Sequence, residues 1–383
     1  MLNRYIGKYS PFSYNTPTNY ETYTGRKNII QNIEKNIPKI QNGNPQHYLL
    51  TGKKGYGKTS TCLYLEEKHY NKLHTVYVNN KDNNSLENIC TEIIETLLNL
   101  FPQKIKQALK NNMFQEETND LEPYSKDIKK YFPSYLEYTC KYLKKPILLI
   151  IDDIDELLEE KQFTGWYESI NETIKNNTYQ IPIYFLLTCQ PNTYKRTPET
   201  FKKIFQSENL NKLKDEEVEE FFINAFETVE MEIDTGKWDE NPYNSFINFT
   251  SGIPWLMQTI GEKIFQHAHY TNKITQHDID QGLIDSAEIT YTREIKPIYE
   301  KHFKDPIFDR LFKKTIKTLT SDDFTIEDFK QTLTADELIF LEEYLQKAIK
   351  LDLIKKEKEK YTFNNPLYSV YFTEKIKQDK TPL

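Results

Sequence analysis

Cysteine, glycine, arginine and long apolar runs are all scarce in this 383-residue chain. The four cysteines stand singly without a CxxC pair, so neither a zinc site nor a disulfide framework is predicted. The longest apolar stretch, Ile147–Ile151, is far below membrane-spanning length, and the first residues contain no apolar leader segment. We therefore expect a cytoplasmic protein without a membrane partner.

The charge balance and the length limit the classes of protein further. A net charge of −7 argues against a chain that coats nucleic acid by bulk electrostatics, and only five arginines are present to contact phosphates. Hydrophobic residues make up 38% and charged residues 28%, which is typical of a folded protein. At 383 residues, two or three domains are expected.

One motif of the form GxxxxGK[ST] begins at Gly52, between a short apolar segment at 46–51 and a segment with helical spacing from Lys58. Glycines let a backbone wrap phosphates, a lysine adds charge at the β/γ-phosphates, and a Thr59 hydroxyl suits Mg²⁺. We predict a binding site for ATP and Mg²⁺. Its expected nucleotide-binding residues are Gly52, Lys53, Lys54, Gly55, Tyr56, Gly57, Lys58, Thr59 and Ser60.

Two aspartates follow the apolar run at 146–151, as expected at the end of a central parallel strand. Asp152 is predicted to hold Mg²⁺ with Thr59, while Asp153 occupies the position where related ATPases usually carry a glutamate that polarises water. The alternative for both is a solvated strand end or a helix cap. Thr188, at the end of the next strand, is predicted to sense the γ-phosphate or to be an ordinary strand-end threonine.

The segments alternate between strand and helix up to residue 213 and then change character. Strands are expected at 46–51, 75–79, 146–151, 183–188 and, more weakly, 210–213. This alternation predicts an α/β P-loop NTPase core with a parallel sheet over residues 1–213. A purely helical pattern predicts a lid over 214–296, and helix plus β-hairpin predicts a winged helix over 297–383.

Several motifs resemble AAA+ and STAND-type ATPases, in particular archaeal-type and origin-recognition ATPases. They are YTGR from Tyr23, LLIIDDIDEL from Leu148 and FLLTCQP from Phe185, and the strand order is similar to that of ASCE-type P-loop proteins. The resemblance implies that Tyr23, Gly25 and Arg26 lie near the base. The alternative is a loop that precedes a helix.

The segment SGIPW at 251–255 resembles the GxP motif of STAND lids, which implies that Pro254 approaches the nucleotide. Two positions depart from the pattern, because Trp255 and Gln190 stand where relatives usually carry an arginine. The missing group could come from a neighbouring copy in a homo-oligomer, with Arg196 as the candidate arginine finger. The alternative for Arg196 is an exposed loop residue.

Three functions remain open from the sequence. The chain is an ATP-driven switch or assembly ATPase, an initiator-like or transposon-regulator-like ATPase that binds duplex DNA through its winged helix, or a nucleotide-dependent module that docks a protein partner with negligible turnover. Six lysines favour DNA, at 347, 350, 355, 356, 358 and 360. Five acidic residues interleave with them, at 342, 343, 352, 357 and 359, which favours a solvated surface.

Overall fold

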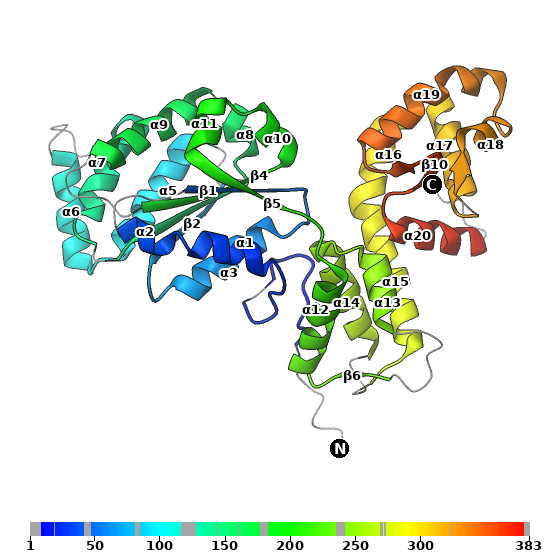
Figure 1. The fold of residues 1–383 in the computed structure, drawn as a ribbon, viewed down its shortest axis with the longest axis horizontal. Helices are drawn as coiled ribbons and strands as arrows, with labels where there is room; N and C mark the ends of the chain where they lie inside the picture. The colour runs from blue at the N-terminus through cyan, green and yellow to red at the C-terminus, as the bar shows by residue number, and fades with distance from the viewer. Residues whose placement is uncertain are drawn as a thin grey trace. The chain divides into compact units, whose positions relative to one another are not determined.

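In the computed structural model, the chain forms two compact units (Figure 1). One unit comprises Pro17–Asn211, and the other begins at Lys212 and includes the residues before Pro17. The structure describes residues 9–18, 20–41, 47–80, 85–115, 128–143, 145–159, 161–176, 183–234, 242–268, 271, 273–321 and 323–378. Among these residues, no helix is long and apolar enough to cross a membrane.

A five-stranded parallel sheet forms the centre of the Pro17–Asn211 unit, with the order β2-β3-β4-β1-β5. Its strands are β1 His47–Gly52, β2 His74–Asn79, β3 Ile147–Asp152, β4 Ile183–Cys189 and β5 Phe205–Leu210. Strand β4 lies between β1 and β3, so the strand that leads into the glycine-rich motif is not adjacent to the strand that ends at Asp152. The predicted parallel α/β core is confirmed.

The fifth strand lies earlier in the chain than predicted. We expected it at 210–213, whereas β5 spans Phe205–Leu210 and pairs with β1 from His47–Phe205 to Gly52–Leu210. The prediction was wrong because the four residues between Phe205 and Leu210 are polar (QSEN). An edge strand exposes such residues and therefore carries a weak apolar signal.

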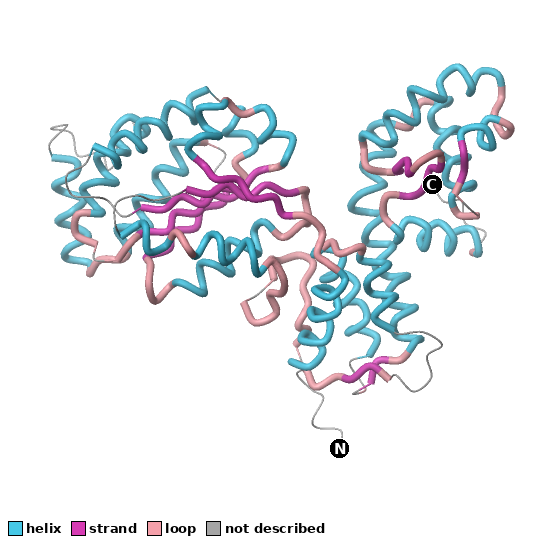
Figure 2. The backbone as a smooth tube through the Cα atoms, viewed as in Figure 1, coloured by secondary structure: helices cyan, strands magenta, loops and turns pink. Residues whose placement is uncertain are grey.

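Helices cover both faces of this sheet (Figure 2). They are α1 Lys27–Glu34, α2 Ile37–Gln41, α3 Lys58–His69, α5 Leu86–Asn99, α6 Gln103–Gln115, α7 Ile128–Cys140, α8 Asp155–Glu159, α9 Lys161–Asn176, α10 Pro191–Arg196 and α11 Glu199–Ile204. Alternate strand residues belong to two separate apolar clusters, one with α1 and α3 and the other with α5, α7 and α9. A sheet buried on both faces presents its functional residues at the strand ends.

The other unit begins with a helical region. Its helices are α12 Asp215–Thr228, α13 Pro242–Thr250, α14 Pro254–Ala268, α15 Gln276–Thr290, the π-helix η3 Tyr291–Ile295, and α16 Lys296–His302. The region is not purely helical as predicted, because β6 Glu232–Ile233 pairs in parallel with β7 Lys273–Ile274. Phe12 also packs here, edge-on to Phe226 with ring centroids 5.1 Å apart, although the sequence had suggested that the first residues belong to the core.

A winged helix follows. Its elements are α17 Pro306–Leu319, β8 Phe324–Thr325, α18 Ile326–Lys330, α19 Ala335–Lys350, β9 Ile354–Glu357 and β10 Lys360–Phe363, with α20 Pro366–Lys377 after it. Strand β10 pairs antiparallel with both β8 and β9, so the hairpin forms the wing of a three-stranded sheet. The topology confirms the predicted winged helix, in which α19 is the third helix.

Candidate functional site

The glycine-rich motif forms a loop from the end of β1 at Gly52 to the start of α3 at Lys58. Gly55 and Gly57 have φ angles of 84° and 83°, a left-handed conformation that a glycine adopts at little cost. The Lys58 Nζ donates to the Gly52 carbonyl at 2.8 Å. The loop therefore holds a cationic amine and the first N–H groups of α3 together, which is the chemistry that binds phosphate.

The Asp152 carboxylate, 2% exposed at the end of β3, is the centre of the site. Its Oδ2 accepts hydrogen bonds from the Thr59 hydroxyl at 2.6 Å and from the Tyr77 hydroxyl at 3.0 Å. Its Oδ1 accepts one from the Thr188 hydroxyl. Three neighbouring elements, α3, β2 and β4, thus converge on one carboxylate.

Tyr77 is a contributor that sequence reasoning missed. Burial and the negative charge of Asp152 raise the pKa of Tyr77, so the phenol stays protonated and donates its hydrogen bond. Strand register decides this contact, because Asn79 pairs with Asp152 and Tyr77 with Ile150 in the parallel ladder. A single tyrosine within an apolar strand segment gives no signal that could have found it.

Asp153 has a backbone conformation unusual for a residue with a side chain, with a φ of 61°. Its N–H donates to the Thr188 Oγ1 at 2.8 Å, and its carbonyl accepts from the Asn80 Nδ2 at 3.1 Å. Such left-handed residues cost about 1 kcal/mol and concentrate at functional sites. Thr188 therefore contacts both aspartates, as its predicted position beside the Asp152 strand requires.

Asp155 stabilises the start of helix α10. Its carboxylate accepts the Gln190 N–H at 2.9 Å and the Thr193 hydroxyl, and thereby caps α10. Burial and a hydrogen bond with Asp153 raise the pKa of Asp155. Gln190, the residue at which relatives often carry an arginine, is the N-cap of this helix.

The residues before α1 pack against α3 and the glycine-rich loop. The Tyr23 hydroxyl lies 2.9 Å from the Thr61 Oγ1, its ring stacks on Tyr64 with centroids 4.2 Å apart, and burial raises its pKa to about 12. Gly25 and Arg26 are both left-handed. The Arg26 guanidinium donates to the Tyr56 carbonyl at 2.6 Å, so this arginine supports the loop backbone directly.

Two further predicted residues are placed by local contacts. Ser60 accepts the Thr18 N–H at 3.1 Å, which fixes its hydroxyl on the side of the N-terminal segment. Arg196 is exposed at the end of α10, and its Nε donates to the Asn192 carbonyl of the same helix at 3.4 Å. Such a position suits either an arginine finger or an ordinary surface residue, and the role of Arg196 stays a prediction.

The SGIP segment forms a tight turn before α14. Ser251 and Gly252 have positive φ angles, and the Gly252 carbonyl accepts the Leu213 N–H at 2.7 Å. A Cβ on Gly252 would lie 2.2 Å from the Leu213 carbonyl oxygen, so only glycine fits. Pro254 is the first residue of α14, and its approach to a nucleotide stays a prediction.

An arginine does lie beside this segment, from an element that the sequence did not indicate. The Arg293 guanidinium, in the π-helix η3, lies 3.8 Å from the Trp255 ring centroid, and the Trp255 Nε1 donates to the Tyr14 carbonyl at 3.2 Å. Burial lowers the pKa of Arg293. Trp255 therefore stacks against an arginine that a later helical segment supplies.

The geometry defines the class of protein. A glycine-rich loop at β1, a carboxylate at the end of β3 and an intervening β4 that supplies Thr188 are the arrangement of a P-loop ATPase domain. Among the described residues, no cluster of three histidine, cysteine or acidic side chains could hold a metal by itself. A P-loop Mg²⁺ site needs no such cluster, because phosphate oxygens and water molecules together supply most of its six ligands.

Comparisons with known proteins agree with this class. Residues 41–196 match the family model described as an AAA domain. A Walker-type ATPase of Pyrococcus abyssi has 13% identity and a TM-score of 0.55, with 93% of this chain and 98% of the other covered. The ORC2 protein of Aeropyrum pernix, solved as ADPNP–ADP complexes, has 13% identity, coverage of 92% and 94%, and a TM-score of 0.58. No match is found among the curated proteins.

Residues 41–196 are thus similar to an AAA domain, and the predicted resemblance of the chain to AAA+ and origin-recognition-like proteins is confirmed. At 13% identity, these two solved structures show a similar fold over 93% and 92% of this chain.

Proposed function

We propose that this protein is an ATP- and Mg²⁺-binding molecular switch that hydrolyses ATP slowly. The observation that carries the proposal is the buried Asp152 carboxylate, which joins the Thr59 hydroxyl of the P-loop to Thr188 of β4. A hydroxyl and a carboxylate are hard oxygen ligands of the kind that Mg²⁺ prefers. These residues fit ATP·Mg²⁺, and such a metal ion would neutralise charge on the phosphates.

The residues around Asp153 suit the activation of water. Asp153 follows the metal-binding carboxylate by one residue, and the buried Asn80 Oδ1 beside its backbone accepts no hydrogen bond within the described part of the chain. In the proposed reaction, Asp153 orients the attacking water and Lys58 balances charge on the γ-phosphate. A shorter carboxylate than the usual glutamate favours slow turnover.

The switch consists of a nucleotide-dependent rearrangement. In it, Pro254 approaches the nucleotide, as the resemblance to STAND lids implies. Tyr23, Gly25 and Arg26 lie on the adenine side. ATP shifts the equilibrium between two arrangements only if it binds one of them more tightly. In a homo-oligomer, Arg196 of a neighbouring copy would complete the site. We place the protein in the cytoplasm.

The alternative of a DNA-binding ATPase depends on the wing. Lys355 pairs with Glu357 at 2.6 Å and Lys356 with Glu359 at 3.6 Å, so half of the four wing lysines are engaged by acids. Duplex DNA competes with these ion pairs for the lysines, and binding would fall steeply with salt. The third alternative, a protein-docking module with negligible turnover, is favoured by Asp153.

The test measures nucleotide affinity and steady-state hydrolysis in the same preparations. Lys58→Ala should weaken ATP binding by about 100-fold, and Asp153→Asn should keep affinity within about twofold while turnover falls at least about 100-fold. Lys72→Ala, on an exposed lysine after α3, is the matched control and should leave both unchanged.

Each alternative predicts another result. Tight ATP binding by Lys58→Ala would contradict the assignment of the ATP-binding site to the glycine-rich loop. Turnover stimulated by duplex DNA at low salt and lost at high salt would favour the DNA-binding ATPase. Turnover that is undetectable in the wild type, with tight ATP binding, would favour the docking module.

A further inference from the structure

Helix α19 of the winged helix exposes three consecutive apolar side chains. Leu338 is 42% exposed, Ile339 76% and Phe340 37%. The opposite side of the same helix buries Leu341, Tyr344 and Leu345 in the core. Of the three exposed residues, Phe340 also lies edge-on to Phe308, with ring centroids 6.4 Å apart. Contiguous exposed apolar residues on a well-packed domain are typical of an interaction surface.

The charge beside these residues is negative. One helical turn further on, Glu342 follows Leu338 and Glu343 follows Ile339, and both glutamates are exposed. Neither makes a salt bridge with any residue that the structure describes. The one exposed basic residue of α19 is Lys350, in its last turn, because Lys347 is partly buried over the Phe308 ring at 4.9 Å.

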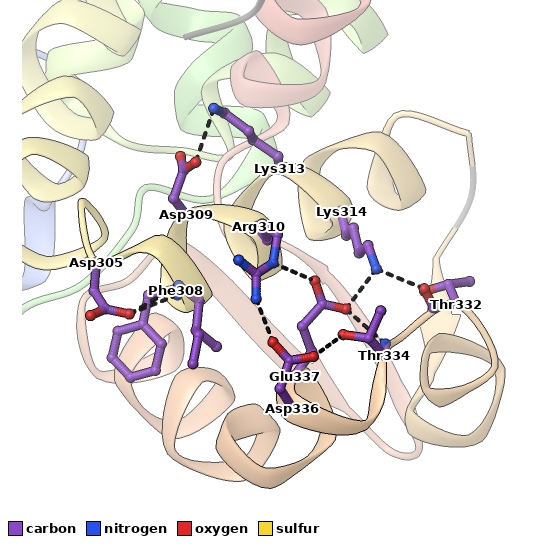
Figure 3. A network of polar contacts seen from close by, with 11 residues as sticks. Asp305, Phe308, Asp309, Arg310, Lys313, Lys314, Thr332, Thr334, Asp336 and Glu337 are labelled. Atoms are coloured by element: carbon purple, nitrogen blue, oxygen red, sulfur yellow. Dashed lines mark hydrogen bonds and ion pairs between the residues drawn. The ribbon is translucent and has the colours of Figure 1, made fainter.

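The start of α19 is held firmly by ion pairs with α17 (Figure 3). Glu337, fully buried, accepts from the Lys314 Nζ at 2.6 Å and the Arg310 Nε at 3.2 Å. Arg310 also pairs with Asp336 at 2.6 Å, which neutralises the other acid of the first turn. The apolar side chains are therefore presented on a fixed helix, and Glu342 and Glu343 carry the uncompensated charge.

This surface has the wrong chemistry for duplex DNA. In a DNA-binding winged helix, the third helix enters the major groove and needs donors and cations that contact bases and phosphates. Here the same helix offers apolar side chains and two unpaired carboxylates. A basic, apolar partner complements it in both respects.

We propose that the α19 face, comprising Leu338, Ile339, Phe340, Glu342 and Glu343, docks a protein partner through an amphipathic helix. The partner helix carries apolar side chains that cover the three apolar residues and lysine or arginine that pair with the two glutamates. The rigid start of α19 lowers the ordering cost of docking. The proposal names the kind of partner and does not depend on nucleotide binding.

The test uses three labelled peptides of ~18 residues and the full-length protein in fluorescence anisotropy. The first peptide places leucine on one helical face and lysine on the other, the second has the same composition in scrambled order, and the third replaces lysine by glutamate. We expect the first to bind at least about tenfold more tightly than the other two. Equal affinity for the three peptides, or no binding of the first, would overturn the proposal.

Variants then locate the binding site. Ile339→Asp should weaken binding of the leucine–lysine peptide by about tenfold or more. Ile376→Asp, on an isoleucine that is 44% exposed on α20, is the matched control and should bind like the wild type. The double variant Glu342→Lys and Glu343→Lys should reverse the preference in favour of the leucine–glutamate peptide. Circular dichroism melting checks that each variant is folded.

Two further outcomes bear on the proposal. Undiminished binding to Ile339→Asp would overturn it, and so would tight, salt-sensitive binding of duplex DNA that Ile339→Asp abolishes. Lys58→Ala should bind the leucine–lysine peptide normally in the absence of nucleotide. A failure of the nucleotide site is therefore distinguishable from a failure of the α19 face.

Discussion

Two buried carboxylates, one in each unit, show how the same group performs opposite tasks. Asp152 is 2% exposed, and it accepts hydrogen bonds from three neutral hydroxyls. Glu337 is fully buried and paired with two cations. Within the described residues, Asp152 makes no salt bridge. A buried carboxylate without a cationic partner destabilises the fold and suits a site that binds a cation. A buried carboxylate that is paired with cations instead stabilises the packing of the helices around it.

The largest expected effect comes from Asp152→Asn, which removes the unpaired charge. Mg²⁺-dependent ATP hydrolysis should fall by at least about 100-fold, because the amide is a poor ligand for Mg²⁺. The melting temperature should stay level or rise, since a buried charge without a cation is lost. Hydrolysis assays and calorimetry on the same samples test both parts. A large loss of stability would show that Asp152 is structural as well.

Glu337→Gln tests whether the buried carboxylate that is paired with cations stabilises the fold. The neutral amide would leave Lys314 and Arg310 without their buried partner, and we expect the winged-helix unit to lose about 2 kcal/mol of its free energy of unfolding. Urea unfolding measures the loss, and ATP affinity should stay unchanged. Glu342→Gln, on an exposed and unpaired glutamate of the same helix, is the control for stability.

The pairing of Glu337 with cations should also make the stability of the winged helix depend on pH. Burial by itself would raise the pKa of Glu337, but the hydrogen bonds from Lys314 and from the Thr334 N–H outweigh it and lower the pKa from 4.5 to about 2. A lowered pKa means that this stabilisation is complete above about pH 4.5 and is lost as the pH falls towards 2. The stability of Glu337→Gln should therefore depend less on pH in this range than that of the wild type.

The smallest effect is expected for Tyr77→Phe, which removes one of the three hydroxyls on Asp152. Metal affinity or turnover should fall by roughly tenfold, because groups that orient a metal ligand typically contribute this much. The readout that separates a positioning role from a purely structural one is the Mg²⁺ concentration at half-maximal activity, which should rise. An unchanged Mg²⁺ dependence would contradict the role of Tyr77.

Local patterns revealed more of the core than of the other unit. The loop from Gly52 was predictable because its residue types and spacing are imposed by phosphate chemistry, and β3 because it is an unbroken apolar run. Strand β5 was misplaced because an edge strand carries polar residues. The contact of Tyr77 with Asp152 depends on the register between two strands, which no single segment encodes.

In the winged helix, the missing information is tertiary. Thr334 and Glu337 have the spacing of a capping box, and the structure contains one. The pairing of Glu337 with Lys314 and Arg310 depends on how α17 lies against α19, which a sequence of mixed charges does not reveal. From the sequence alone, the mixture of lysines and glutamates near the wing does not distinguish a DNA partner from a protein partner. The proposal of a protein partner depends on which α19 side chains are exposed, and only the structure shows this.

The run α15–η3–α16 has a mechanical consequence. It continues without a break from Gln276 to His302, and at ordinary helical rise it spans about 40 Å. Arg293, about two-thirds of the way along it, is stacked on Trp255 next to the SGIP turn. The arm from Arg293 to Gln276 is about 25 Å long, so a tilt of about 10° at Arg293 would displace the Gln276 end by about 4 Å. The π-helical turn is the place where such a rod changes its twist most easily.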